Sequence, residues 1–191
     1  MNIYKLILKR RSIRKFKQKP LSLRFLKKLV NAAHLAPSGA NLQPLEYVCI
    51  NDKGICDNVF RTLTWAGYIS PKGTPKEGEK PAAYILILVN PSIRKENYQY
   101  DVGMAMENII LTALDEGVGS CLIGSINRAM LSEILNISSH FIIDSIVALG
   151  YPNENPKVEK LTNDCKYWKD HNGRLHVPKR DINTIVHFNK V

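Results

Sequence analysis

The sequence predicts one domain of alternating helices and strands, of either the α/β or the α+β class. Its 191 residues suit a single domain over 1–191 or one protomer of an intertwined dimer. Hydrophobic residues make up 45% and charged residues 23%, a balance that argues against disorder. Segments with helical periodicity alternate with short apolar runs, and this alternation predicts the mixed class.

The first half of the chain begins with two amphipathic patterns. "NIYKLILKR" has apolar residues at helical spacing behind Asn2, a potential N-cap, and a second apolar stripe runs between Ser22 and Pro37. "EYVCIN" then predicts a strand, and "DNVFRTLTWAGY" (57–68) predicts a short helix. The segment Ile69–Ala82 is rich in Pro, Gly and Lys and predicts a loop.

The second half contains the strongest helix and the most apolar strand. "YILILV" (84–89) predicts a buried strand, and residues 98–116 form a long amphipathic helix that ends before Gly117. The remaining predicted elements are a strand at 119–124, a helix at 128–135 behind Asn127, a strand at 141–152 and a short helix capped by Asp181.

Positive charge dominates the composition, with 27 Lys and Arg against 17 Asp and Glu, which favours anionic ligands or partners. "KRRSIRKF" (9–16) concentrates five of these cations near the start of the chain. Guanidinium groups bind phosphate oxygens in a bidentate manner, and Ser12 adds a hydroxyl donor. A bound phosphate, a solvated charged stretch and nucleic acid all remain open, although no aromatic platform or recognition helix supports nucleic acid.

A polar loop, "APSGANLQP" (36–44), follows the second predicted helix. Gly39 permits a close backbone approach, and Ser38, Asn41 and Gln43 offer donors and acceptors at short spacing. This set is richer than a turn requires, but a plain connecting loop remains the alternative.

Two further segments carry possible binding groups. "GSCLIGS" (119–125) predicts a strand whose end presents backbone N–H groups, while its glycines follow a helix and so do not match the dinucleotide fingerprint. "HVPKRD" (176–181) places Lys179 and Arg180 just before a predicted helix start, where an anion is also favoured. Each of these signals is weak when taken alone.

Several kinds of site and location are not predicted. The four cysteines form no CxxC pair and are expected to be free thiols, and the five histidines form no metal-binding pattern. No side chain stands out as a catalytic nucleophile, acid or base, and no metal site is expected. Apolar runs are too short to span a bilayer and the start lacks a signal-peptide core, so a cytoplasmic protein without membrane partners is expected.

Taken together and in this order, four segments resemble the FMN-dependent nitroreductase family. "RRSIRKF" is similar to its RRSxRxF motif, and "APSGANLQP" is similar to its APSxxNxQPW motif. "DVGMAMENIILTALDEGVGSCLIGS" resembles its long central helix followed by GLGSCWIG, and "ALGYP" resembles its late strand ending in LGYP. The resemblance runs from about Tyr4 to Arg180. It implies an α+β fold with a central, mostly antiparallel sheet flanked by helices, in an intertwined homodimer with FMN at the interface.

The resemblance also implies the residues that contact FMN. The groups expected at the phosphate and at the ribityl chain or adjacent ring edge are Arg10, Arg11, Ser12 and Arg14, and those approaching the same phosphate from the tail are Lys179 and Arg180. The residues expected along the isoalloxazine ring, from the partner protomer, are Pro37, Ser38 and Gly39, with Asn41 and Gln43 nearby. Those expected at flavin N5 and O4 are the backbone N–H groups of Gly124 and Ser125, with Leu122 and Ile123 packing beside the ring.

By the same resemblance, the chain is expected to be an NAD(P)H-dependent nitroreductase or flavin oxidoreductase. NADH or NADPH would reduce FMN and leave, and a small planar acceptor such as a nitroaromatic or quinone would then enter the same pocket in a ping-pong cycle. Leu45 and Leu122 stand where the family often has tryptophan, so an FMN-binding sensor or storage protein with little turnover is the alternative. The segment Val59–Lys80 is the evident source of a lid, with Tyr68 available for stacking and Trp65 expected in the core.

Overall fold

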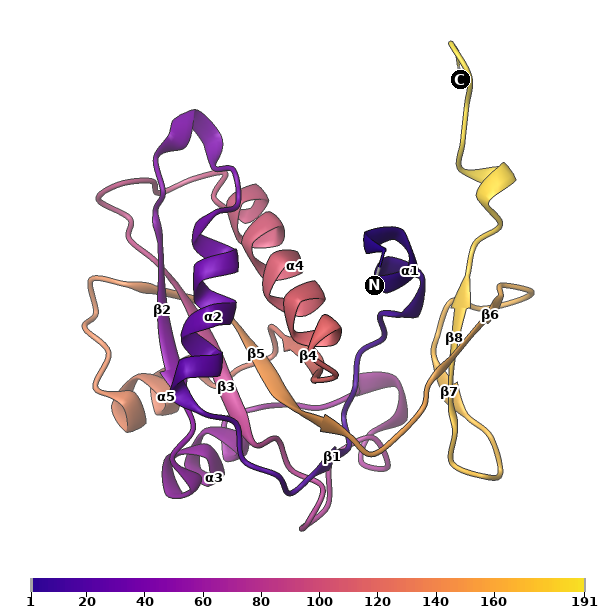
Figure 1. The fold of residues 1–191 in the computed structure, drawn as a ribbon, viewed down its shortest axis with the longest axis horizontal. Helices are drawn as coiled ribbons and strands as arrows, with labels where there is room; N and C mark the ends of the chain where they lie inside the picture. The colour runs from indigo at the N-terminus through magenta and orange to yellow at the C-terminus, as the bar shows by residue number, and fades with distance from the viewer. Residues whose placement is uncertain (1, 191) are drawn as a thin grey trace.

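The computed structural model describes residues 2–190 as a main body with a smaller sheet beside it (Figure 1). The helices are α1 (Ile3–Lys9), α2 (Leu23–His34), α3 (Lys53–Arg61), α4 (Gln99–Asp115) and α5 (Arg128–Leu135). The strands are β1 (Phe16–Lys17), β2 (Leu45–Ile50), β3 (Ala83–Val89), β4 (Gly119–Ile123), β5 (Ile142–Pro152), β6 (Lys157–Lys160), β7 (Trp168–Lys169) and β8 (Leu175–Lys179). Short 3-10 turns occur at η1 (Gly39–Asn41), η2 (Gly67–Ile69) and η3 (Ile182–Thr184).

The main sheet is antiparallel and is covered by helices on both faces. Its strand order is β1-β5-β3-β2, with β4 also paired to β5. Every residue of β3 is buried, because α2 and α4 pack against one face of the sheet while α3 and α5 pack against the other. This arrangement confirms the predicted α+β class with a central antiparallel sheet flanked by helices. Among residues 2–190, no helix is both long and apolar enough to cross a bilayer.

The helix predicted over 57–68 is wrong in its position. α3 begins at Lys53, because the side chain of Asp52 caps it by accepting the Ile55 N–H at 2.9 Å, and it ends at Arg61. Beyond Arg61 the chain pairs with the segment that follows β4, and Thr64 N–H donates to the Ser125 carbonyl at 3.0 Å. These tertiary hydrogen bonds outweigh the local helical pattern.

Side chains in this region and the cysteines follow the sequence predictions. Trp65 is 2% exposed and stacks on Phe60, which confirms its place in the core. The cysteines are free thiols, as predicted.

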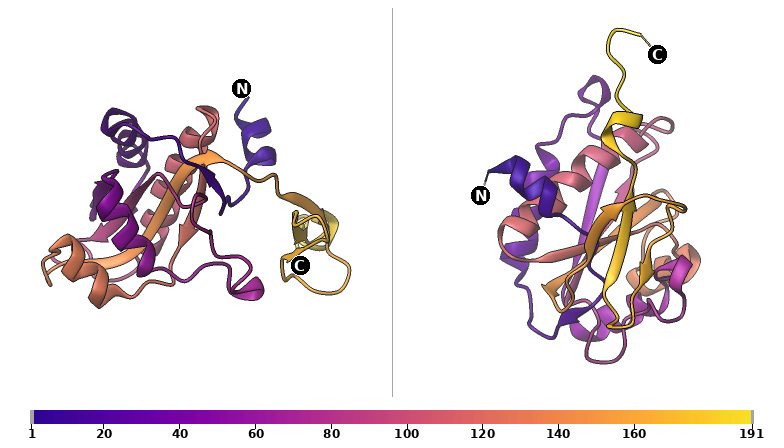
Figure 2. Two further views of the ribbon diagram at one scale, coloured as in Figure 1. Left: turned by 90° about the horizontal axis from the view of Figure 1, so that it is seen from below. Right: turned by 90° about the vertical axis from the view of Figure 1, so that its right-hand side faces the viewer.

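The second sheet was not predicted from the sequence. β8 lies between β6, which runs parallel to it, and β7, which runs antiparallel. These strands are short and largely polar, so they lack the apolar alternation by which a strand is recognised. Beyond β8 the chain turns once at η3, the short helix expected behind Asp181, and projects past the body (Figure 2).

Candidate functional site

The basic segment between α1 and β1 is fixed to the sheet by its apolar residues. Ile13 and Phe16 are buried, and the Ile13 N–H donates to the Ser120 carbonyl at 2.8 Å. Two glycines make room for them: a Cβ on Gly119 would lie 2.8 Å from Ile13 Cγ1, and one on Gly150 would lie 2.8 Å from the Phe16 ring. The RRSxRxF-like segment and the LGYP-like strand therefore pack against each other directly.

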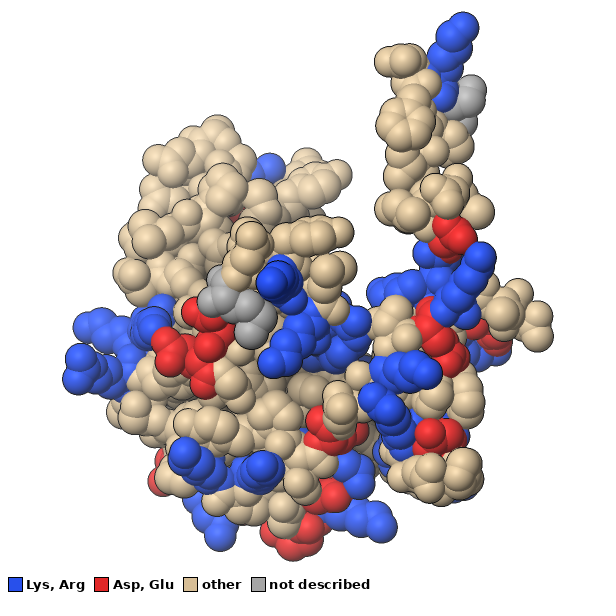
Figure 3. Space-filling model, turned by 45° about the vertical axis from the view of Figure 1, so that its right-hand side comes forward, with Lys and Arg blue, Asp and Glu red and all other residues tan. Residues whose placement is uncertain are grey.

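Between these anchors, the polar residues of the segment line a cavity. Arg10, Arg11, Ser12 and Arg14 surround a space of ≈ 140 Å³ together with Tyr167, Val177 and Lys179. Figure 3 shows Lys and Arg side chains gathered on both sides of the hollow between the main body and the second sheet. The lining contains no carboxylate. Five of the six residues predicted at the phosphate are thus brought together, although Lys179 is far from the others in the sequence.

The cations of this cavity have weak or non-ionic partners. Arg10 Nε lies 3.8 Å from a carboxylate oxygen of Glu107, a loose and half-exposed pair. The Arg14 guanidinium lies over the Tyr167 ring, 4.9 Å from its centroid. Burial and the charge of Arg10 lower the pKa of Arg11, which means that the site disfavours its positive charge. An anion in this cavity would relieve that repulsion, so the donor set fits a phosphate.

Glu154 fixes the backbone of this segment. Its Oε1 accepts the Arg14 N–H at 2.5 Å and the Lys15 N–H at 3.3 Å, and the Asn153 N–H donates to the Lys15 carbonyl at 2.8 Å. The carboxylate binds backbone groups, so the guanidinium of Arg14 stays available to a ligand.

Arg180, the sixth predicted phosphate residue, lies outside the lining of this cavity. Its side chain is exposed, and Nη2 donates to the Thr184 carbonyl at 3.2 Å within the projecting tail. The structure therefore places Lys179, but not Arg180, beside the arginines.

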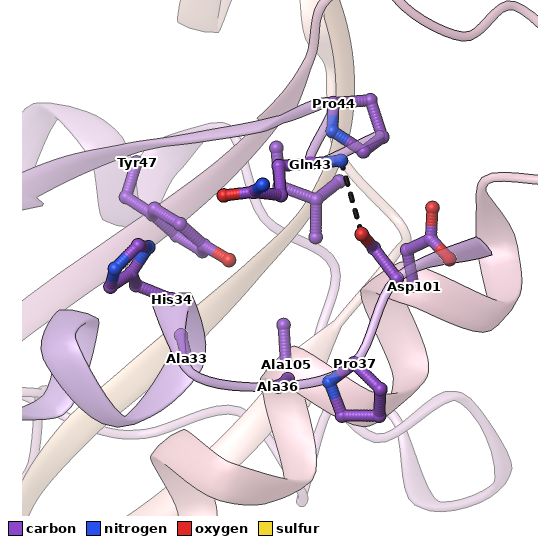
Figure 4. Close-up of a pocket in the computed structure, with 11 residues that line it drawn as sticks. Ala33, His34, Ala36, Pro37, Gln43, Pro44, Tyr47, Asp101 and Ala105 are labelled. Carbon is purple, nitrogen blue, oxygen red and sulfur yellow. Dashed lines mark hydrogen bonds between the residues drawn. The ribbon is translucent and has the colours of Figure 1, made fainter. Parts of the chain in front are cut away.

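The polar loop after α2 forms a second, smaller cavity (Figure 4). Pro37, Ser38 and Gln43 line a space of ≈ 50 Å³, with Asp101 facing it from the first turn of α4. Within the loop, the Gln43 N–H donates to Ser38 Oγ at 3.1 Å. Asn41 is exposed beside this cavity and does not contribute to its lining.

A buried carboxylate holds this loop in place. Asp101 is 2% exposed, accepts the Gly39 N–H at 2.9 Å and pairs with Arg94 Nη1 at 3.2 Å. A Cβ on Gly39 would collide with the guanidinium of Arg94, so a larger residue would have to displace this group from its pair with Asp101. The predicted role of Gly39 in a close approach is thereby explained by a side chain from a distant segment.

The backbone of the same loop is strained. Ala40, Asn41 and Gln43 have φ values of 51°, 56° and 53°, in the left-handed region that residues with a Cβ seldom adopt. Such conformations cost free energy, and they cluster at sites where function requires a fixed backbone. The loop therefore presents its polar groups on a strained backbone.

At the end of β4, three of the four predicted ring contacts are exposed, and one of them, Gly124, has open space beside it. Leu122 is 42% exposed, Gly124 and Ser125 are exposed, and a Cβ on Gly124 would meet no atom within 4 Å. Ile123 is different, because alternation along the strand buries its side chain in the core at 6% exposure. The side chain of Ile123 therefore belongs to the core cluster, and its expected place beside the ring stays a prediction.

The two cavities are separate within one chain. Their linings share no residue among those described: the smaller cavity borders β2, whereas the basic cavity lies between the segment before β1 and β8. One protomer thus presents the basic cavity and, separately from it, the polar loop after α2. No group of His, Cys, Asp and Glu in residues 2–190 has the arrangement of a metal site.

Sequence reasoning missed three residues of these sites. Asp101 had a usable signal, since it is a carboxylate at the start of an apolar helix stripe that contains Val102 and Ala105. Glu154 and Tyr167 had none, because their roles depend on contacts with a segment about 140 to 150 residues earlier in the chain.

These features define an α+β domain with helices on both faces of an antiparallel sheet and a basic cavity beside it. The sequence model of the Nitroreductase family matches residues 7–151. A relative from Archaeoglobus fulgidus, named as an NADH dehydrogenase/NAD(P)H nitroreductase, is 31% identical over 157 residues, which cover 78% of this chain and 85% of the relative. The chain belongs to the nitroreductase family, as its motifs predicted, and this agrees with the prediction of an oxidoreductase enzyme.

Solved structures give the same result for the fold. A nitroreductase family protein from Clostridium novyi NT has a TM-score of 0.69 at 28% identity, covering 80% of this chain and 86% of that protein. An FMN-dependent nitroreductase from Clostridium difficile R20291 has a TM-score of 0.68 at 24% identity, covering 97% and 98% of the two chains. The predicted nitroreductase-like fold is confirmed.

Proposed function

We propose that this protein is an FMN-dependent oxidoreductase that passes electrons from NADH or NADPH to a small planar acceptor such as a nitroaromatic or a quinone. The observation that carries the proposal is the cavity lined by Arg10, Arg11, Ser12, Arg14 and Lys179, which holds several cations and no carboxylate. Family membership and the FMN-dependent nitroreductase among its structural relatives support the same cofactor.

The basic cavity would hold the phosphate of FMN. Guanidinium forks of Arg10 and Arg14 supply charge-assisted hydrogen bonds, Ser12 adds a hydroxyl, and Lys179 closes the site from β8. Arg11 has a smaller role, because its Nη2 already donates to the Leu8 carbonyl at 2.9 Å. The site is rigid, since Ile13 and Glu154 fix the backbone on which these groups stand.

The loop Pro37–Pro44 would line the flavin ring of a second protomer. It is separate from the basic cavity of its own chain, so one chain alone offers only half of the expected site. A homodimer is supported by apolar side chains left exposed on α1, on the first turns of α4 and along the tail, namely Ile3, Tyr4, Ile7, Leu8, Tyr100, Met104, Ile182 and Phe188. Large exposed apolar side chains of this kind would be covered in a dimer interface.

Hydride acceptance and donation are the chemistry that bound FMN supplies. The residues of the chain bind and orient it, which accounts for the absence of an evident acid, base or nucleophile in the predicted set. Backbone N–H groups at Gly124 and Ser125, which stand exposed at the end of β4, would favour negative charge on the ring edge they face.

An absorbance spectrum tests this proposal most directly. The purified protein supplied with FMN is expected to be yellow, to bleach anaerobically with NADH or NADPH, and to recover its colour on adding a nitroaromatic. A folded protein that does not retain FMN would contradict the proposal.

An FMN-binding protein with little turnover is the second candidate. The exposure of Leu122 favours it, since an aliphatic residue stands at the ring-facing end of β4 where the family often has tryptophan. Steady-state oxidation of NADH and NADPH with a panel of quinones separates the two: bound, reducible FMN without turnover would favour the second candidate.

A further inference from the structure

Tyr167 stands in the basic cavity although no sequence motif marks it. It precedes β7 and lines the same space as the arginines and Lys179. Its ring lies under the Arg14 guanidinium at 4.9 Å, a distance at which a cation is attracted to an aromatic face. Arg14 has a long, flexible side chain and no ion pair among the described residues, so this ring is the contact that orients it.

The ring of Tyr167 also contacts a second aromatic ring. Tyr68, in η2, packs against it with centroids 5.0 Å apart and an angle of 53° between the rings. Beside this pair, Lys169 Nζ donates to the Lys72 carbonyl at 3.1 Å. Both contacts join the segment after α3 to the second sheet, so Tyr167 connects that segment to the basic cavity.

We propose that Tyr167 is a positioning residue for anion binding: its ring, held by Tyr68, directs the Arg14 guanidinium into the basic cavity. The proposal rests on the proposed function, in that the anion is taken to be the phosphate of FMN. Tyr167 acts through Arg14 and needs no contact with the ligand. It also gives the segment after α3 a structural link to the cofactor site.

The test compares the dissociation constants of FMN and riboflavin, which differ by the phosphate alone. Tyr167→Leu and Tyr167→Gln are expected to weaken FMN by about three- to tenfold while riboflavin binding stays constant, because the lost interaction acts on the phosphate only. Tyr167→Phe keeps the aromatic face and is expected to retain the wild-type ratio of FMN affinity to riboflavin affinity. Tyr68→Leu is expected to lower the ratio by a smaller factor.

A double-mutant cycle separates positioning from general damage. If Tyr167 acts through Arg14, Tyr167→Leu adds little to the loss already caused by Arg14→Gln. The matched control is Tyr151→Leu, which removes a similar contact in which Lys19 Nζ lies 4.3 Å from the ring centroid, in no cavity of the proposed site. Its ratio of FMN to riboflavin affinity is expected to equal that of the wild type.

The outcomes separate this inference from the proposed function. A wild-type protein that binds FMN no better than riboflavin would overturn the phosphate site and the inference with it. A wild-type preference for FMN that survives in both non-aromatic variants would overturn the role of Tyr167 alone. Losses in Arg14→Gln and Tyr167→Leu that multiply in the double variant would do the same.

Discussion

The basic cavity and the polar loop are built in different ways. The cavity collects side chains from both ends of the chain on an unstrained backbone, and its cations lack strong partners within the described residues. The loop is local, strained and already satisfied, since Asp101 takes up the Gly39 N–H and pairs with Arg94. The first arrangement is suited to recognise charge, and the second is suited to present a fixed shape.

The comparison predicts that removing positive charge from the basic cavity weakens the binding of the FMN phosphate and leaves the binding of the flavin ring unchanged. In the double variant Arg10→Gln/Arg14→Gln, each lost charge-assisted hydrogen bond costs about 1.5–3 kcal/mol, so FMN binding is expected to weaken by roughly 100-fold or more. Riboflavin binding should be unchanged, as measured by flavin fluorescence titration. The control Arg24→Gln/Lys27→Gln makes the same change in net charge at exposed residues of α2. Equal FMN affinity in both double variants would contradict the role of the basic cavity in phosphate binding.

Removing Asp101, which supports the polar loop, should affect stability and should weaken FMN and riboflavin binding alike. Asp101→Ala leaves Arg94 and the Gly39 N–H without their partner, and we expect it to lower the free energy of unfolding by about 2–4 kcal/mol. FMN and riboflavin should weaken by the same factor, because the ring surface is lost and the phosphate site is intact. Urea denaturation measures the stability change. The exposed pair of Lys28 and Glu116 supplies the control, since Glu116→Gln should cost less than about 1 kcal/mol.

The anchoring of the basic segment can be tested at Gly150. Gly150→Ala places a methyl group against Phe16, and overpacking of this kind is expected to destabilise the protein by about 1–3 kcal/mol. Gly67→Ala is the control, because its Cβ would meet no atom within 4 Å and the effect should stay within about 0.5 kcal/mol. Thermal denaturation distinguishes the two, and equal melting temperatures would contradict the packing argument.

The smallest expected effect is a pH dependence confined to the second sheet, which carries Lys179. His176 in β8 lies between Glu159 at 2.6 Å and Asp170 at 3.2 Å, and these hydrogen bonds raise the pKa of the imidazole above its ordinary 6.5. A raised pKa stabilises the fold fully below pH 6.5, and this contribution is lost as pH rises through the folded-state value.

The two carboxylates set the lower limit of this window. The hydrogen bond from His176 lowers the pKa of Glu159 from 4.5, and the backbone N–H of Arg174, followed by His176, lowers the pKa of Asp170 from 3.8. The contribution of each carboxylate is present above its ordinary pKa and is lost as pH falls through the lowered one. The melting temperature should therefore decline as pH rises above 6.5, and His176→Gln should remove that decline. The same decline in His176→Gln as in the wild type would show that another group titrates.

Much of the main body could be predicted because its signals are local. The continuous apolar run of β3, the amphipathic pattern of α4 and the N-cap Asn127 each act over a few residues, and each element formed where it was expected. The helix expected over 57–68 failed because hydrogen bonds from the segment after β4 redirect the chain beyond Arg61. The second sheet was missed because its short strands have no apolar alternation.

The sequence by itself determined the family, through the order of its motifs, and the residue types available to bind an anion. Only the tertiary structure decided which of these residues meet. It brought Lys179 to the arginines and left Arg180 on the tail, turned Ile123 into the core, and placed Asp101 against the polar loop and Tyr167 in the basic cavity. The physical reason is that local patterns encode helices and strands, whereas a contact between distant segments depends on how those elements pack.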